Sequence, residues 1–168
     1  MLYQVTVPQY KKMLNVLAQL LDKAEIHFKE LNVSDEVLLN FRLAPDMFPL
    51  SKQIYIACDT VKFLVHDLAG KKTSENTYSA KNLKDFQERV KDAISALESL
   101  NPGDLEGKED KLVTQPWWGG KSLRGYDYVL EHSIPTFYFH VTTAYAILRH
   151  NGLQIGKGDF LGSLPFKG

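Results

Sequence analysis

The chain has 168 residues, with 20 Lys and Arg residues against 20 Asp and Glu residues, so its formal net charge is zero. This length predicts one domain over residues 1–168, and the balanced charge gives no electrostatic basis for binding nucleic acid or an anionic membrane. Cys58 is the only cysteine, no secretory signal is recognisable, and no apolar run approaches the roughly 20 residues that span a bilayer, so we expect a cytoplasmic protein.

The first predicted helix spans residues 8–31. Its apolar residues recur at steps of three and four, which places them on one face of the helix. These residues are Met13, Leu17, Leu20, Ala24, Phe28 and Leu31. Asn32 is expected to end this helix, and a short helical turn with Ser34 as its N-cap follows.

The second predicted helix runs to about Ala69, where Gly70 ends it. Asp46 is expected to cap its start, and Pro49 suits its first turn. Its apolar face consists of Leu50, Ile54, Ala57, Val61, Leu64 and Leu68. Gln53 borders this face, whereas Asp59, Lys62 and His66 lie on another side of the helix and are expected in solvent.

The third predicted helix spans residues 80–100, after a polar linker at 71–79. Its apolar face comprises Leu83, Phe86, Val90, Ile94 and Leu97. The long segment 104–132 that follows is expected to carry structure or function of its own. Within it, residues 112–114 and 122–124 are expected to form a small β-hairpin that covers one end of the helices, with the turn at Trp117–Gly120.

The fourth predicted helix begins at Pro135, which suits a first helical turn, and ends at Asn151–Gly152. Its apolar face contains Phe137, Val141, Ala144 and Leu148. His140 lies at the edge of this face and is therefore expected to point inward. The tail after Gly152 is expected to be irregular chain that docks through Phe160 and Phe166.

Four long amphipathic helices with little strand signal predict an all-α fold, a four-helix bundle in which each apolar face is covered. Several segments together resemble a bacterial family of unknown function within the DinB-like superfamily. They cover essentially the whole chain: Asp22–Ala24, Arg42–Leu50, Gln53 with Ala57–Asp59, Pro135–Gly152, Ile155–Lys157 and Asp159–Gly162. The resemblance implies an antiparallel four-helix bundle and a homodimer. The aromatic residues of the long loop and the tail also favour a homodimer, because they need cover.

The superfamily includes thiol transferases and hydrolases that bind a divalent metal, zinc or nickel, through three histidines. The resemblance places His140 at one of these ligand positions. The position four residues earlier holds Thr136, and the second helix offers Gln53 instead of a histidine. Two of the three expected ligands are therefore absent. Asp46 could add a carboxylate only if the fold brought it near His140.

These residues predict that His140 is buried at the edge of the core and hydrogen-bonded to the second helix, with Gln53 as its first candidate partner. The candidate ligand pocket consists of Asp46, Gln53, Trp117, Trp118 and His140, in which Trp117 and Trp118 form either a hydrophobic lid or a pocket wall. His140 is the one candidate metal ligand.

Two functions remain open at this stage, and the sequence does not decide whether the protein is an enzyme. The first is a non-catalytic or small-molecule-binding protein with a degenerate metal site. The alternative is an atypical divalent-metal-dependent transferase or hydrolase that uses His140. No nucleophile elbow, phosphate-binding glycine loop or dinucleotide fingerprint supports another chemistry.

Overall fold

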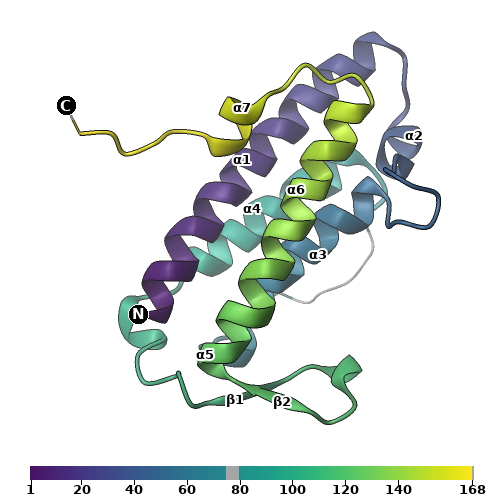
Figure 1. Ribbon diagram of the computed structural model, residues 1–168. Coiled ribbons are helices and arrows are strands. Elements are labelled where there is room, and N and C mark those ends of the chain that lie inside the picture. Colours follow the sequence, from purple (N-terminus) through teal and green to yellow (C-terminus); the bar gives the residue numbers. More distant parts are fainter. Residues whose placement is uncertain (75–79, 168) are drawn as a thin grey trace.

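Four long helices carry the predicted apolar faces and pack against one another (Figure 1). The structure is a computed structural model that describes residues 1–74 and 80–167; the linker predicted at 71–79 thus lies partly outside the described residues. The long helices are α1 (Leu2–Glu30), α3 (Leu50–Phe63), α4 (Leu83–Glu98) and α6 (Ile134–His150). The shorter elements are α2 (Asp35–Asn40), α5 (Gly125–Asp127), α7 (Lys157–Leu161), β1 (Leu112–Thr114) and β2 (Ser122–Arg124), with π-helical segments at Leu64–Leu68 and Tyr128–Ser133 and 3₁₀ turns at Pro102–Asp104 and Pro116–Trp118. A mostly helical fold with one small hairpin is confirmed.

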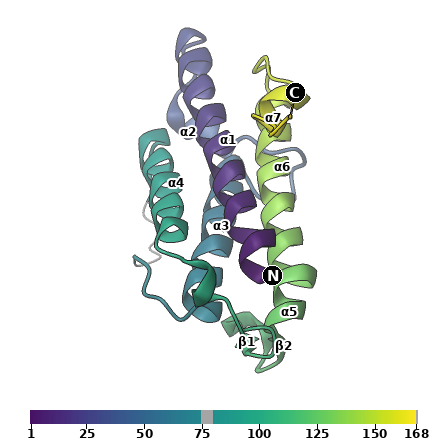
Figure 2. The same cartoon turned by 90° about the vertical axis from the view of Figure 1, so that its left-hand side faces the viewer.

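The helices form a ring in which α1 and α3 lie between α4 and α6 (Figure 2). The apolar faces meet inside this ring. Leu17 of α1, Ile54 of α3, Val90 of α4 and Leu148 of α6 have no solvent-accessible surface, which confirms the predicted helical phases. No helix among the described residues is long and apolar enough to cross a membrane.

The helix directions differ from a fully antiparallel bundle. Asp59 of α3 pairs with Arg89 of α4, and one turn later Lys62 pairs with Asp92, so α3 and α4 run parallel. The pairs α1/α4 and α3/α6 are antiparallel, whereas α1 and α6 are parallel (Figure 1). The expectation of antiparallel packing therefore holds for only part of the ring. The two successive helices α3 and α4 therefore begin at the same end of the bundle.

The starts of α1 and α4 differ from the prediction. Helix α1 begins at Leu2, because Leu2 and Val7 extend the buried face upstream, and Pro8 lies inside the helix. Leu31, placed on the apolar face, is 57% exposed because the helix has already ended. Helix α4 begins at Leu83, after a capping box between Asn82 and Asp85 that satisfies free backbone N–H groups.

The segment before α3 also differs from the prediction. Asp46 is exposed in a turn and does not cap the helix, which starts after Pro49 with no side-chain cap. The break between α2 and α3 is instead held by Arg42, whose Nη1 donates to the carbonyls of Pro45 and Met47, each at 3.3 Å. These contacts join Arg42 to the loop that leads into α3.

The charged side of α3 is buried, contrary to the expectation for Asp59 and Lys62. Their exposed fractions are 6% and 2%, because α4 covers this side of α3 and supplies their partners. His66, in the π-helical segment after α3, is exposed as predicted.

The hairpin is confirmed, with Val113 opposite Leu123 in an antiparallel register. It leads into a helical stretch that starts at Gly125, ten residues before Pro135, and continues into α6. A π-helical segment precedes Pro135, and its wider turn suits a residue that lacks an N–H donor. Gly125 is required where it lies, since a Cβ there would be 2.0 Å from the Lys108 carbonyl oxygen.

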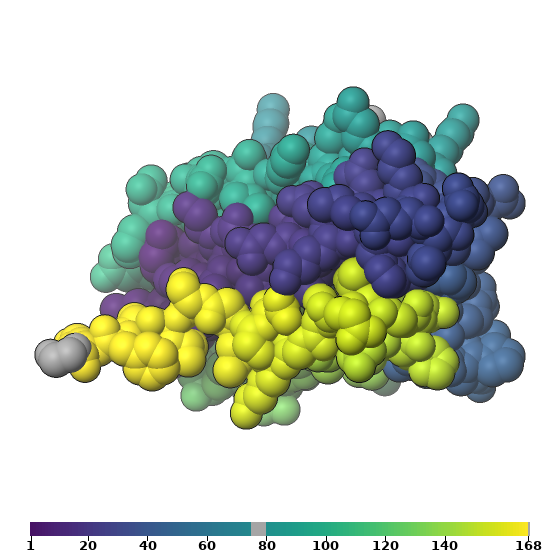
Figure 3. All heavy atoms as spheres, turned by 90° about the horizontal axis from the view of Figure 1, so that it is seen from above, coloured from purple at the N-terminus to yellow at the C-terminus, as the bar shows by residue number. Residues whose placement is uncertain are grey.

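The C-terminal segment lies along α1 (Figure 3). It contains the short helix α7, where an irregular chain was expected, because Asp159 accepts from the Gly156 N–H and pairs with Lys23. Phe160 packs on Tyr145 with ring centroids 5.6 Å apart, as expected for a docking residue. The same expectation is wrong for Phe166, which is 86% exposed beyond the end of α7.

Candidate functional site

His140 and Gln53 form the contact that their helical phases predict. Nδ1 of His140 lies 2.6 Å from Oε1 of Gln53, and the two side chains are 8% and 1% exposed. The amide nitrogen of Gln53 donates to the carbonyl oxygen of Phe48 at 2.9 Å. The predicted hydrogen bond between the fourth and second long helices along the chain is therefore confirmed.

The second bond of Gln53 determines which nitrogen of His140 carries the proton. Because the Gln53 amide nitrogen faces a carbonyl oxygen, the Gln53 oxygen must face the imidazole. That oxygen only accepts, so Nδ1 of His140 donates and Nε2 holds the lone pair. Burial lowers the pKa of His140 to about 4, which keeps the ring neutral at pH 7.

The side chains around His140 do not fit a zinc or nickel centre. Thr136 stands one helical turn before His140, and the oxygen of Gln53 already accepts a hydrogen bond. Asp46 is exposed on the loop before α3. Within residues 1–74 and 80–167, no group of three or more His, Cys, Asp and Glu side chains could hold a metal ion. One imidazole with an amide and a hydroxyl is a poor ligand set for these metals.

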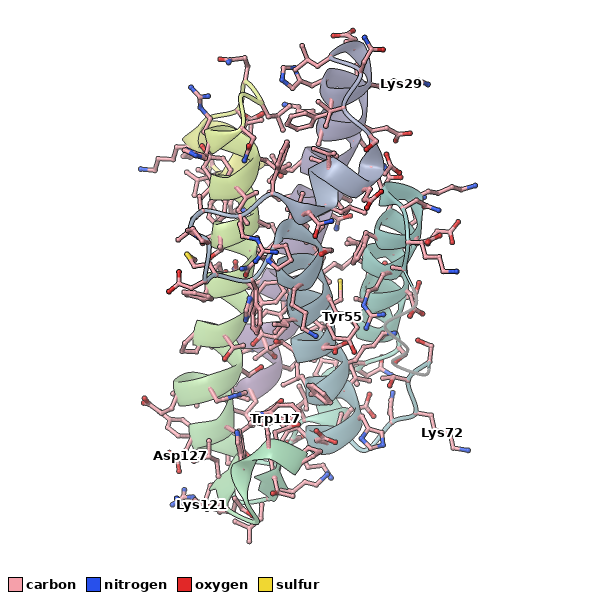
Figure 4. All side chains as sticks on the ribbon, turned by 90° about the vertical axis from the view of Figure 1, so that its right-hand side faces the viewer. Lys29, Tyr55, Lys72, Trp117, Lys121 and Asp127 are labelled. Carbon is pink, nitrogen blue, oxygen red and sulfur yellow. The ribbon has the colours of Figure 1, made fainter. Side chains whose placement is uncertain are left out.

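A cleft of about 620 Å³ lies between α3 and the helical stretch that leads into α6. In Figure 4, Tyr55 lies on α3 and Trp117 lies nearer the hairpin, between the α3 and α6 ribbons. The lining is mostly apolar or aromatic, with a few polar groups: Phe48, Lys52, Tyr55, Ile56, Asp59, Thr60, Phe63, Trp117, Tyr128, His132 and Thr136. This composition is typical of a small-molecule site.

One wall of the cleft is backed by a network of polar groups on α3 and α4. The Arg89 guanidinium pairs with the Asp59 carboxylate at 2.6 Å and lies over the Tyr55 ring, 4.1 Å from its centroid. The Lys52 ammonium lies over the same ring at 4.4 Å. Burial raises the pKa of Asp59 and outweighs the opposite effect of the Arg89 guanidinium. The network holds Tyr55 and Asp59 in defined positions.

The opposite wall contains His132, which sequence reasoning did not consider. Its ring stacks on Tyr128 and meets the edge of Trp118, with centroids 5.7 and 4.9 Å apart. Burial lowers the pKa of His132. Its Nδ1 is buried without a hydrogen-bond partner among the described residues. A sequence signal existed, because His132, Thr136 and His140 follow one another at four-residue steps, but the preceding segment was interpreted as a loop.

The predicted pocket residues fall into four places. Gln53 and His140 bond to each other next to Phe48, whose carbonyl accepts from Gln53. Phe48 lines the cleft, whereas Gln53 and His140 do not. Trp117, 60% exposed, lines the cleft and packs on Phe63 with ring centroids 5.5 Å apart. Trp118 lies behind the lining against His132. Asp46 is exposed and is not among the residues that line the cleft.

Comparisons with known proteins agree with this architecture. A family model described as Domain of unknown function (DUF1993) matches residues 2–161. A crystal structure of a DinB family member protein from Shewanella denitrificans is similar to this chain, with 42% sequence identity and a TM-score of 0.90; the similarity covers 100% of this chain and 96% of that chain. No curated protein matches the chain.

We expect His140 to make the free energy of unfolding depend on pH. Its folded-state pKa of about 4 lies below the ordinary value of 6.5, so the unfolded chain binds more protons between these pH values. The stability present above pH 6.5 is therefore lost as the pH falls toward 4. The free energy of unfolding, measured with denaturant, should fall between pH 7 and pH 5 by roughly 1–2 kcal/mol more for the wild type than for His140→Gln.

The matched control is His150→Gln, because His150 is exposed at the end of α6, whereas His66 contacts the Asp67 carboxylate at 2.6 Å. This variant should keep the full pH dependence of the wild type. Equal pH dependence in the wild type and His140→Gln would show that His140 is not held neutral by burial.

Proposed function

Since the chain belongs to DUF1993, a family of unknown function within the DinB-like superfamily, we propose that it is a non-catalytic protein that binds a small molecule. The ligand occupies the cleft between α3 and α6, and the position of the superfamily's metal site has degenerated. The ring of four long helices supports classing the fold as a DinB-like four-helix bundle, modified by parallel packing of α3 on α4.

The cleft is the observation that carries this proposal. Its volume of about 620 Å³ falls within the range of roughly 300–1,000 Å³ that is usual for ligand sites. Three separate parts of the chain build it: α3, the hairpin turn with Trp117, and the stretch from Tyr128 to Thr136. Apolar walls with a few placed polar groups provide both the driving force for binding and the means of orienting a ligand.

The second support is the internal hydrogen bonding of Gln53 and His140. Gln53 uses its oxygen for His140 and its nitrogen for the Phe48 carbonyl. Both polar groups of the amide are thus occupied by the protein itself. In this arrangement the pair fixes the end of the cleft, and Phe48 with it, without a bound ion.

The alternative is an atypical divalent-metal-dependent transferase or hydrolase that uses His140. One observation favours it: the lone pair on Nε2 accepts no hydrogen bond from the described residues, and Gln53 orients the ring as a carbonyl does for many metal-bound histidines. The lack of further ligands nearby weighs against it. A metal measurement separates the two functions.

We expect the cleft to bind the neutral fluorescent probe N-phenyl-1-naphthylamine, one molecule per chain, with a rise in emission. Thr136→Trp should abolish this rise, because a large side chain on the α6 wall fills the cleft. Fluorescence titration provides the measurement, and thermal unfolding checks that the variant remains folded.

Thr142→Trp is the matched control, since Thr142 lies on the same helix but is exposed outside the cleft. It should bind the probe like the wild type. Absence of probe binding to the wild type, or equal binding by Thr136→Trp, would contradict the proposed function.

The second prediction concerns metal content. Protein purified without an affinity tag should contain far less than one zinc or nickel ion per chain by elemental analysis. His140→Ala should leave this content unchanged. A near-stoichiometric metal that disappears in His140→Ala would overturn the proposal in favour of the metal-dependent enzyme.

We further propose that the protein is a homodimer. Exposed aromatic side chains support this, since Phe139 on α6 and Phe166 in the tail are 57% and 86% exposed. Light scattering should give a mass of about twice the 19.1 kDa of one chain. A mass of one chain at high micromolar concentration would contradict the dimer.

A further inference from the structure

We infer that the ligand of the α3–α6 cleft is a neutral, planar aromatic molecule that carries a carbonyl oxygen. This inference rests on the proposed function, because it assigns a ligand class to the same cleft. Three features of the cleft support it: its aromatic lining, the pairing of its charged groups within the protein, and the donors on its α6 wall.

The aromatic side chains favour a flat ring as the ligand's apolar part. Five of the eleven lining residues are Phe, Tyr or Trp. Phe63 and Trp117 meet at an interplanar angle of 61°, so their rings form a corner of the cleft. Trp117 is 60% exposed and therefore presents open ring surface. Offset stacking and edge-to-face contacts with such rings favour a planar aromatic partner over a saturated one.

The charged groups of the lining already interact with the protein itself. The Asp59 carboxylate pairs with the Arg89 guanidinium at 2.6 Å, and the Lys52 ammonium lies over the Tyr55 ring, 4.4 Å from its centroid. An ionic ligand would lose hydration on entering this mostly apolar cleft, and it would have to displace one of these contacts to reach a counter-charge. A neutral ligand avoids both costs.

His132 supplies a hydrogen-bond donor to the lining. Burial lowers its pKa, so the ring is neutral and carries one proton, on either Nδ1 or Nε2. Nδ1 is buried without a partner among the described residues, and an unpaired buried N–H group is rarer than an unpaired acceptor. The proton therefore lies on Nε2, the other nitrogen of a ring that lines the cleft. A ligand that meets this nitrogen must offer an acceptor.

Thr136 adds a hydroxyl to the same wall. It follows His132 by four residues, and both side chains line the cleft. The hydroxyl can donate or accept, whereas the N–H group of His132 only donates. A carbonyl oxygen has two lone pairs and can accept from both side chains. An N–H group of the ligand in this place would face the N–H group of His132 instead.

The experiment compares four probes of similar size by their displacement of N-phenyl-1-naphthylamine from the wild type. The reference is 2-acetylnaphthalene. The others each lack one property: 2-isopropenylnaphthalene lacks the carbonyl oxygen, 2-naphthoate lacks neutrality, and methyl decahydro-2-naphthyl ketone lacks the planar rings. We expect 2-acetylnaphthalene to bind about tenfold more tightly than each of them, the scale of one hydrogen bond. Equal or tighter binding of any comparison probe would overturn the property that this probe lacks.

His132→Phe tests the donor through a ratio of two affinities. It keeps a flat ring against Tyr128 and Trp118 but removes the N–H group. Calorimetry gives the affinities of 2-acetylnaphthalene and 2-isopropenylnaphthalene for the variant, so a general change in the cleft affects both ligands alike. The preference for the ketone should fall about fivefold relative to the wild type.

The control is His150→Phe, at an exposed histidine outside the cleft, and it should keep the wild-type preference. Thermal unfolding checks that both variants are folded. The full wild-type preference in His132→Phe would overturn the role of His132. The comparison of the four probes on the wild type tests the ligand class independently of either variant.

The two proposals fail in different ways. If N-phenyl-1-naphthylamine binds to the wild type and 2-acetylnaphthalene has no advantage over the other three probes, the ligand class is wrong and the proposed binding function stands. If neither N-phenyl-1-naphthylamine nor any of the four probes binds, the proposed function itself is wrong.

Discussion

Buried polar side chains on α3 need partners, and the arrangement of the neighbouring helices provides them. Gln53, Asp59 and Lys62 are all less than a tenth exposed, and an unpaired polar or charged group at such positions would be costly. Gln53 bonds to α6, whereas Asp59 and Lys62 bond to α4. These bonds couple α3 to both neighbours and set their positions along its axis. Apolar packing alone would leave that alignment less well defined, because hydrophobic contact is not directional.

The same helix divides into two functional regions. One region, around Gln53, occupies the place where the superfamily resemblance leads one to look for a metal ligand, yet its amide is bonded entirely within the protein. The other region faces the cleft and consists of Lys52, Tyr55, Ile56, Asp59, Thr60 and Phe63. The two regions share Phe48, whose carbonyl receives the Gln53 bond while its side chain lines the cleft. Under the proposed function, a chain without the superfamily's metal ligands keeps the cleft, since the bond between Gln53 and His140 fixes the wall that they share.

Local and periodic features could be predicted from the sequence, whereas pairings between distant charged residues could not. The apolar faces, the hairpin and the approach of His140 to Gln53 follow from spacing, because a helical period sets which side chains share a face. Burial of Asp59 and Lys62 depends on their ion pairs with Arg89 and Asp92 of α4. The spacing of residues in α3 does not predict these partners. Asp46 was expected as a cap from residue type alone, but the helix starts three residues later.

His132 illustrates a further limit of sequence reasoning. It lies in a π-helical segment, in which each turn takes up an additional residue, so the side chains on either side change phase relative to an α-helix. A search for an apolar face that begins at Pro135 does not reach this segment, although the four-residue steps continue through it. His132, which lines the cleft and whose Nδ1 is buried without a partner among the described residues, is consequently a residue that the periodic analysis passed over.

The parallel packing of α3 on α4 has a consequence for how the chain folds. The principal helix contacts among the described residues are α3 with α6, α1 with α4, α3 with α4, and α1 with α6. None of these pairs is a tight hairpin of two successive antiparallel helices, which would be the fastest unit to form. The contacts between these helices thus join residues far apart in the chain, and their loop-closure entropy must be overcome before they are made. The protein should accordingly fold more slowly than an up-and-down bundle of equal length, even though its helices are long and strongly amphipathic.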